Sequence, residues 1–298
     1  MLDRIRAEIA HWNKTDRLVA NGTRLYWTDH PRVSHHYRRK ALIDGLPWRT
    51  RIPQALGGPA EYALELGCGS GENTHATWRA GTARHVTGID LDDSRFAEVR
   101  SGMKSQGAPV SFQAADIDHL SLEPSRYGLI YAIQSFHHFE RLEHICAEIS
   151  KALVPGGFFV LDEFVGPARF QWTDKQLALT AQLLGLMPRP LRMYANGIEK
   201  RAEGRSTPEQ VIQVCPSEAI RSNEIVQVFR DHFDVVHEKN LGGTIQHLLY
   251  SGIVQNFPDD DEATNIMVDS INSLEELFID SGVLPSDFML LIGRKRGT

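Results

Sequence analysis

The stretch LELGCGSGENTHA, residues 64–76, places three glycines at alternate positions behind an acid. Gly67, Gly69 and Gly71 follow Glu65 and a short apolar run. A glycine is needed where the backbone is left-handed or where another group lies against the main chain. The stretch stands where a first strand should pass into a first helix, which is the edge of an open α/β sheet where ligands bind. It therefore predicts a ligand-binding turn.

Short β-rich runs alternate with helical segments from residue 61 onward. The runs are YALEL, VTGID, VSFQAAD, LIYAIQ and FFVLDEF, and FDVVHE and FMLLIG follow near the end of the chain. Residues 94–107 and 141–157 between them carry apolar side chains at helical spacing. Strands that alternate with helices predict an α/β fold with a parallel, doubly wound sheet.

Two segments depart from this alternation. The helical pattern of residues 1–58 predicts an N-terminal helical cap, and the main domain is expected over residues 59–298. Within the main domain, residues 166–222 predict a helical insertion, in which Thr173 and Thr207 are the expected helix starts.

Acids follow the second and third predicted strands. Asp90 stands 19 residues after Gly71, a distance at which a carboxylate accepts hydrogen bonds from a ribose diol. Asp116 and Ile117 are suited to pairing with an adenine edge. The dinucleotide fingerprint G-x-G-x-x-G fails, because Glu72 stands where its last glycine should be. The pattern therefore favours a nucleoside site.

Five motifs in this order resemble the class I S-adenosylmethionine-dependent methyltransferases: E-x-G-x-G-x-G, GID, AAD, YGLIYAIQSFHHF and LVPGGFFVLDE. The resemblance covers roughly residues 61–165, and the tail FDVV…FMLLIGRK fits the closing strands of that family. It implies a Rossmann-like sheet of seven strands with an antiparallel last strand. It also implies S-adenosylmethionine as cofactor, with S-adenosylhomocysteine as product. The residues that would hold the cofactor are Glu65, Gly67, Gly69 and Gly71 at the methionine part, Asp90 and Leu91 at the ribose, Asp116 and Ile117 at the adenine, and Gln134 over the methionine side.

Methyl transfer from a sulfonium needs alignment and the exclusion of water, and a base when the acceptor loses a proton. The candidate bases are His138, His137, Glu163 and His247. The histidines could instead be packing residues, and Glu163 could be a surface acid or a clamp on a substrate amine or hydroxyl. The sequence predicts a small-molecule methyltransferase and favours oxygen as the acceptor atom. N-, C- or carboxyl-methylation and a catalytically silent cofactor-binding partner protein remain alternatives.

The insertion supplies aromatic and cationic side chains. Arg169, Trp172 and Tyr194 predict a lid over the acceptor, in which arginines could bind a carboxylate or phosphate. Their alternative is a purely structural role within the insertion. From the N-terminal cap, the run His35, His36, Tyr37, Arg38 and Arg39 could close the cofactor pocket from the other side, or could consist of solvated polar residues without a role.

Composition excludes some partners. The formal net charge is −6 and the pI about 6.1, which disfavours nucleic-acid and anionic-membrane partners. No run approaches a membrane span, and the N-terminus is too charged for a signal peptide. Three cysteines without short spacing predict reduced thiols in a cytoplasmic protein, and no CxxC or HxxxH pair predicts a metal. A homodimer through the N-terminal helices is a further hypothesis.

Overall fold

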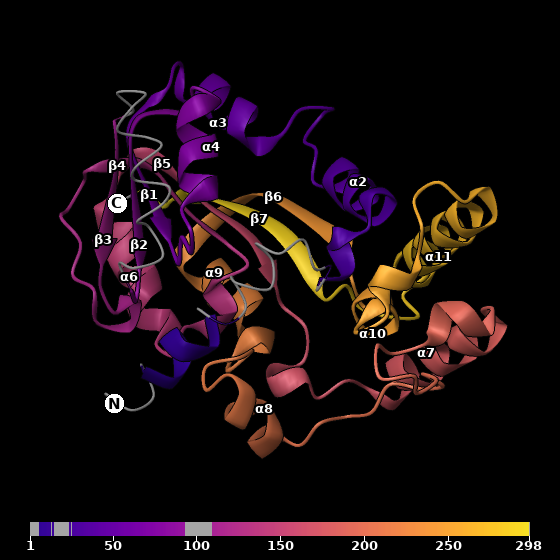
Figure 1. Ribbon diagram of the computed structural model, residues 1–298. Coiled ribbons are helices and arrows are strands. Elements are labelled where there is room, and N and C mark those ends of the chain that lie inside the picture. Colours follow the sequence, from indigo (N-terminus) through magenta and orange to yellow (C-terminus); the bar gives the residue numbers. More distant parts are fainter. Residues whose placement is uncertain (1–5, 13, 15–23, 25, 93–108, 298) are drawn as a thin grey trace.

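A seven-stranded sheet forms the centre of the molecule (Figure 1). The structure is a computed structural model that describes residues 6–12, 14, 24, 26–92 and 109–297. The strands are β1 (Ala60–Leu66), β2 (Ala83–Asp90), β3 (Val110–Ala114), β4 (Tyr127–Ile133), β5 (Leu153–Phe164), β6 (Phe233–Gly242) and β7 (Phe288–Lys295). They lie in the order β3-β2-β1-β4-β5-β7-β6, and β7 runs antiparallel to both of its neighbours while β1 to β5 are parallel. The predicted Rossmann-like sheet with an antiparallel last strand is confirmed.

Strand β4 illustrates why the central strands are apolar throughout. Leu129 and Tyr131 belong to a buried cluster on one face of the sheet, and Ile130 and Ala132 belong to a second cluster on the other face. A parallel strand that helices cover on both faces has no side that can remain polar. The edge strand β3 is more exposed, as its single neighbour allows.

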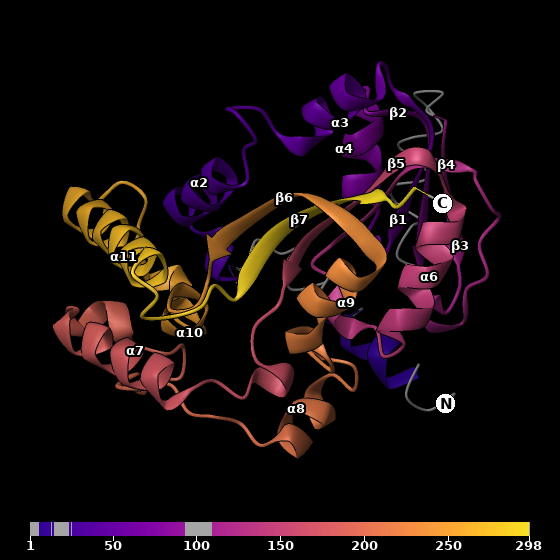
Figure 2. The ribbon, with the colours of Figure 1, turned by 180° about the vertical axis from the view of Figure 1, so that it is seen from behind.

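Helices cover both faces of the sheet (Figures 1 and 2). The α-helices are α2 (Pro31–Lys40), α3 (Trp48–Leu56), α4 (Glu72–Arg79), α6 (Leu142–Ala152), α7 (Asp174–Leu186), α8 (Pro208–Val214), α9 (Ile225–His232), α10 (Gln246–Tyr250) and α11 (Glu262–Asp280). Side chains of α3 and α4 pack on one face, and those of α6 and α9 pack on the other. Among the described residues, none of these helices is both long and apolar enough to pass through a bilayer.

Short 3-10 helices connect several of these elements. They are η1 (Trp27–Asp29), η3 (Ile117–His119), η4 (Phe136–His138), η5 (Ala168–Phe170), η6 (Arg189–Arg192), η7 (Ser222–Glu224) and η8 (Val254–Asn256). Two of them, η3 and η4, follow β3 and β4. The carboxyl ends of parallel strands share one edge of the sheet, so η3 and η4 lie at the same edge as the glycine turn after β1.

The predicted helix starts of the insertion are correct. Thr173 and Thr207 each form a capping box with the glutamine three residues later, Gln176 and Gln210. Residues 6–12 are helical. The helix expected over residues 94–107 falls entirely within 93–108, outside the described residues. The domain boundaries themselves remain predictions.

The insertion extends away from the glycine turn. Helix α7 packs against α10, beside α11 and at the opposite end of the molecule from β1 and β2 (Figures 1 and 2). The chain returns to the sheet edge only after α8, where the Ile220 N–H donates to the carbonyl of His137 at 3.1 Å. Residues 215–220 are therefore the part of the insertion that reaches η4.

Candidate active site

The turn between β1 and α4 is built on glycine. Gly67, Gly69 and Gly71 have φ angles of 69°, 53° and 86°, all in the left-handed region. A Cβ on Gly67 would lie 2.4 Å from the Cβ of Ser135, and one on Gly71 would lie 2.4 Å from the Phe112 ring. Conformation and close packing both exclude larger residues here, so the turn presents bare backbone at the sheet edge.

We expect Gly67→Ala to lower the free energy of unfolding by at least about 2 kcal/mol, because the left-handed backbone is strained for alanine and the methyl group overlaps Ser135. Urea denaturation measures this change. Gly204→Ala is the matched control, since its Cβ would meet no atom within 4 Å. Equal stability of the two variants would contradict the prediction.

Asp90 ties the glycine turn to the end of β2. Its Oδ2 accepts the N–H of Gly69 at 2.7 Å, and its Oδ1 accepts the N–H of Leu91 at 2.8 Å. At the next strand, Asp116 accepts the N–H of Asp118 at 3.1 Å and pairs with the His119 ring at 3.0 Å. Both carboxylates are thereby held in defined positions.

These residues line one cavity of about 850 Å³. The volume lies within the range typical of small-molecule sites. Of the predicted cofactor residues, those in its wall are Glu65, Gly67, Gly69, Asp90, Leu91, Asp116, Ile117 and Gln134. Gly71 is not among the wall residues and instead is the N-cap residue of α4. The cavity therefore brings together the ends of β1, β2, β3 and β4.

Glu65 is buried beneath the glycine turn. The hydroxyl of Thr74 donates to its Oε2 at 2.5 Å, and the hydroxyl of Tyr131 does so at 3.3 Å. Burial raises the pKa of this carboxyl to about 8. A carboxyl in this state gains from a cationic ligand, because the ligand would restore the ionised form.

The ligand-free protein should lose stability as the pH rises from about 4.5 to about 8, because folding holds the Glu65 proton that the unfolded chain releases. The contribution of protonated Glu65 to stability is complete below the ordinary pKa of 4.5 and is lost as the pH rises through the raised pKa of about 8. Thermal melting across this range should show a steeper decline for the wild type than for Glu65→Gln. Parallel curves for the two proteins would refute the prediction.

Gln134 follows β4 and has a φ of 52°. Its Nε2 donates to the carbonyl of Asp162 at 3.1 Å and lies 3.3 Å from the hydroxyl of Tyr37. That hydroxyl donates to Asp162 Oδ1 at 2.5 Å. Tyr37 therefore joins α2 to the end of β5 and to Gln134 in the cavity wall.

The two adjacent histidines of η4 have opposite environments. His137 is buried between Glu163, 2.5 Å from its Nδ1, and Glu218, 3.4 Å from its Nε2. Burial favours the neutral ring, but the two carboxylates outweigh it and raise the pKa of His137 to about 10. With both nitrogens paired, His137 is an imidazolium that holds the structure together, and it does not line the cavity.

Glu163 at the end of β5 is fully buried. Besides His137, its carboxylate accepts the backbone N–H groups of Ser135 at 2.9 Å, Phe136 at 2.6 Å and Phe164 at 2.7 Å. These four donors occupy both oxygens. The geometry gives Glu163 the role of fixing the turn after β4, and it stands outside the cavity wall.

His138 is the predicted base that reaches the cavity. Its Nδ1 lies 3.0 Å from the hydroxyl of Ser217, which donates to the carboxylate of Glu8. Burial, together with the charge of His137, lowers the pKa of His138 to about 4, so the ring is neutral near pH 7. Trp12 packs edge-on to it at 5.2 Å. The neutral ring keeps a free electron pair, with which it can accept a hydrogen bond or bind a cation.

His247 and the three predicted lid residues lie away from the cavity wall. His247 is enclosed by aromatic rings, with Trp172 at 5.4 Å and Phe170 at 5.5 Å, and burial lowers its pKa to about 4. Arg169 donates to the carbonyls of Pro216 and Glu218, both at 2.9 Å. The Nζ of Lys200 lies 5.8 Å from the centre of the Tyr194 ring. None of the four is in the cavity wall.

The sequence interpretation missed three side chains that join His138. Glu8 comes from the N-terminal helical residues, and Cys215 and Ser217 come from the segment after α8. Their separation along the chain gave no motif. The isolated Cys215 was interpreted only as a reduced thiol.

Residues 63–157 match a family model described as a methyltransferase domain. This match supports the resemblance of the region to the class I S-adenosylmethionine-dependent methyltransferases. The family resemblance found in the sequence is thus confirmed. The cavity fits the family's cofactor, because a bare glycine turn, a polar group of acids and a buried carboxyl that would gain from a cation all face one space.

Two curated proteins are similar to part of this chain. The sterol methyltransferase-like 2 of Botryococcus braunii is 29% identical over 52% of this chain and 39% of its own. The 27-O-demethylrifamycin SV methyltransferase of Amycolatopsis mediterranei (strain S699) is 28% identical over 39% of this chain and 45% of its own. The match therefore covers less than half of either relative.

A solved structure shows the same fold. It is geranyl diphosphate C-methyltransferase from Streptomyces coelicolor A3(2), in complex with Mg²⁺, a substrate analogue and S-adenosylhomocysteine. The TM-score is 0.50 at 14% identity, over 84% of this chain and 75% of that one. At this identity the likeness concerns the fold of the domain.

Proposed function

We propose that this protein transfers the methyl group of S-adenosylmethionine to an oxygen atom of a small-molecule acceptor. The observation that carries the proposal is that one cavity contains both the glycine turn with its acids and the neutral ring of His138. The cofactor, when bound, supplies an electrophilic methyl group on a sulfonium. The protein's task is to align the two reactants and to exclude water.

The cofactor end uses residues from four strand ends. Asp90 accepts hydrogen bonds from the ribose hydroxyls, and Asp116 with Ile117 holds the adenine. Glu65 pairs with the amine of the methionine part. Because its pKa is raised in the free protein, this pairing would restore the ionised form of the carboxyl. Gln134 borders the same part and is held by Asp162.

The acceptor end lies at His138. Trp12 packs against His138, and Tyr26 also lines the cavity, so both supply apolar surface against which a ring or chain can pack. Of the four candidate bases, His138 is the one in the cavity wall, so we assign the removal of the acceptor's proton to this end. Glu163, His137 and His247 are left as structural residues.

The presence of a group that can remove a proton supports oxygen as the acceptor atom, because a hydroxyl must lose its proton during transfer. It is also supported by the relative whose name describes methylation at an oxygen of a rifamycin. Methylation at nitrogen or carbon is the alternative, as is cofactor binding without transfer. A panel of hydroxylated, amino and carboxylic small molecules with labelled cofactor distinguishes these activities.

His138→Gln should lower turnover at least about 100-fold, the usual contribution of a proton-handling group. Binding of S-adenosylhomocysteine, measured by calorimetry, should stay within a few-fold of the wild type, because the cofactor residues are untouched. His85→Gln on the exposed surface of β2 is the matched control. Full turnover of the His138 variant would overturn the assignment, and absence of cofactor binding by the wild type would overturn the function.

A further inference from the structure

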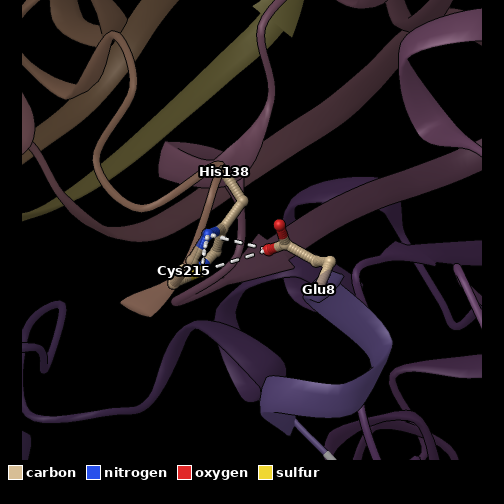
Figure 3. Close-up of side chains that lie close together, drawn as sticks. All are labelled: Glu8, His138 and Cys215. Atoms are coloured by element: carbon tan, nitrogen blue, oxygen red, sulfur yellow. Dashed lines mark hydrogen bonds and ion pairs between the residues drawn. The ribbon is translucent and has the colours of Figure 1, made fainter. Parts of the chain in front are cut away.

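We propose that Glu8, His138 and Cys215 form a binding site for a divalent cation of the zinc type at the acceptor end of the cavity. The three residues come from the N-terminal helical segment, the end of η4 and the residue after α8 (Figure 3). The binding itself is independent of the proposed function. The role that the cation would have in catalysis rests on that function.

The geometry of the three donor atoms supports the proposal. Cys215 Sγ lies 3.3 Å from Glu8 Oε1 and 3.9 Å from His138 Nδ1, and the last two atoms are 3.7 Å apart (Figure 3). A tetrahedral zinc ion with bonds of about 2.0–2.3 Å places its ligand atoms about 3.3–3.6 Å from one another. Shifts of a few tenths of an ångström would therefore bring the three atoms into one coordination sphere.

The donor set has the chemistry of a catalytic zinc site. Thiolate, imidazole and carboxylate are the ligands that zinc prefers, and three protein ligands leave a fourth position open. Glu8 and His138 both line the cavity, together with the hydroxyl-bearing Ser217 that lies between them. The fourth position would therefore be reached from the cavity.

The charges around the two histidines also favour a cation. The two rings pair with three carboxylates, on Glu8, Glu163 and Glu218. Glu8 is 4% exposed and Glu163 is fully buried, so water screens this charge weakly. A divalent cation would offset part of it.

A second carboxylate lies near the ring of His138. Glu218 and His137 each have a ligand atom within 4.8 Å of a ring nitrogen of His138. The Nε2 of His138 is buried and makes no hydrogen bond among the described residues. Coordination through Nδ1 would leave the proton on Nε2, and metal-binding histidines commonly direct that N–H to a carboxylate.

The cation would explain how a hydroxyl acceptor becomes reactive at this end of the cavity. Contact with the cation weakens the O–H bond of the acceptor, and the proton leaves to water. The freed electron pair of the oxygen forms the bond to the methyl carbon, and the electrons of the broken carbon–sulfur bond remain on sulfur. His138 would then act as a metal ligand. The loss of turnover expected for His138→Gln would be the same.

Metal binding by the full chain tests the proposal without any acceptor. We expect the purified, dialysed protein to retain one zinc per chain by elemental analysis. Replacement by Co²⁺ should produce the near-ultraviolet charge-transfer band of a cobalt–thiolate bond. Cys215→Ser should abolish this band, and Glu8→Gln should weaken binding at least about tenfold. Cys68→Ser is the matched control, because this second buried cysteine lies outside the cluster, and it should keep the band.

The outcomes separate the two proposals. Absence of stoichiometric metal in the wild type, or a cobalt band that survives Cys215→Ser, would overturn the metal site and leave a hydrogen-bonded cluster. If S-adenosylhomocysteine still binds in that case, the proposed function stands on its own. Binding of S-adenosylhomocysteine by Cys215→Ser and Glu8→Gln also shows that both variants are folded, so that their loss of metal supports the site.

Discussion

Asp90→Ala is expected to weaken the binding of S-adenosylhomocysteine at least about 100-fold, which corresponds to about 2.7 kcal/mol. Hydrogen bonds to a charged group contribute about 1.5–3 kcal/mol each, and the ribose diol would form two of them with this carboxylate. The variant also removes the acceptor of the Gly69 N–H. The glycine turn would therefore lose both its ligand contact and its anchor.

Calorimetry on the purified variant measures the effect, and thermal melting verifies that it is folded. Asp280→Ala, at the exposed end of α11, is the matched control and should bind as the wild type does. Asp90→Asn keeps the size of the side chain and one acceptor oxygen, so its affinity should fall between the two. Unchanged affinity in Asp90→Ala would remove the ribose from this position and the cofactor assignment with it.

The cofactor half of the site could be predicted because each of its residues belongs to a strand end. Gly69, Asp90, Asp116 and Gln134 follow β1, β2, β3 and β4, and parallel strands bring their carboxyl ends to one edge. A sequence pattern that identifies the strands therefore also identifies the neighbours in space. No contact between distant segments is needed for this inference.

The catalytic half could not be predicted in the same way. His137 and His138 are adjacent in sequence, yet the pKa is raised to about 10 in the first and lowered to about 4 in the second. The difference arises from burial and from partners that the sequence does not connect with them, namely Glu163, Glu218 and Glu8. A pair of histidines in a motif carries no information about these partners.

The insertion shows a second limit. Its helix starts are local, and the capping boxes at Thr173 and Thr207 follow from the sequence. The position of α7 depends on the surface it packs against, which is α10 rather than the cavity. Aromatic side chains such as Trp172 are equally suited to a ligand pocket and to a protein core, and here they pack around His247.

Glu163→Gln is expected to lower the free energy of unfolding by about 3–5 kcal/mol, the usual effect of removing one partner from a buried charged network. The carboxylate accepts three backbone N–H groups and pairs with His137. An amide has one acceptor oxygen, so its NH₂ group would face donors. The His137 imidazolium would also lose a charged partner in a buried position.

Urea denaturation of the wild type, Glu163→Gln and the exposed control Glu262→Gln measures this loss. The same experiment decides between the two roles that the sequence allowed for Glu163. A base contributes to the reaction and little to folding, so its replacement would leave the stability near that of the control while turnover is lost. If Glu163 is a structural anchor, its replacement lowers the stability well below that of the control, because the turn after β4 loosens. The four groups that donate to this carboxylate favour that outcome.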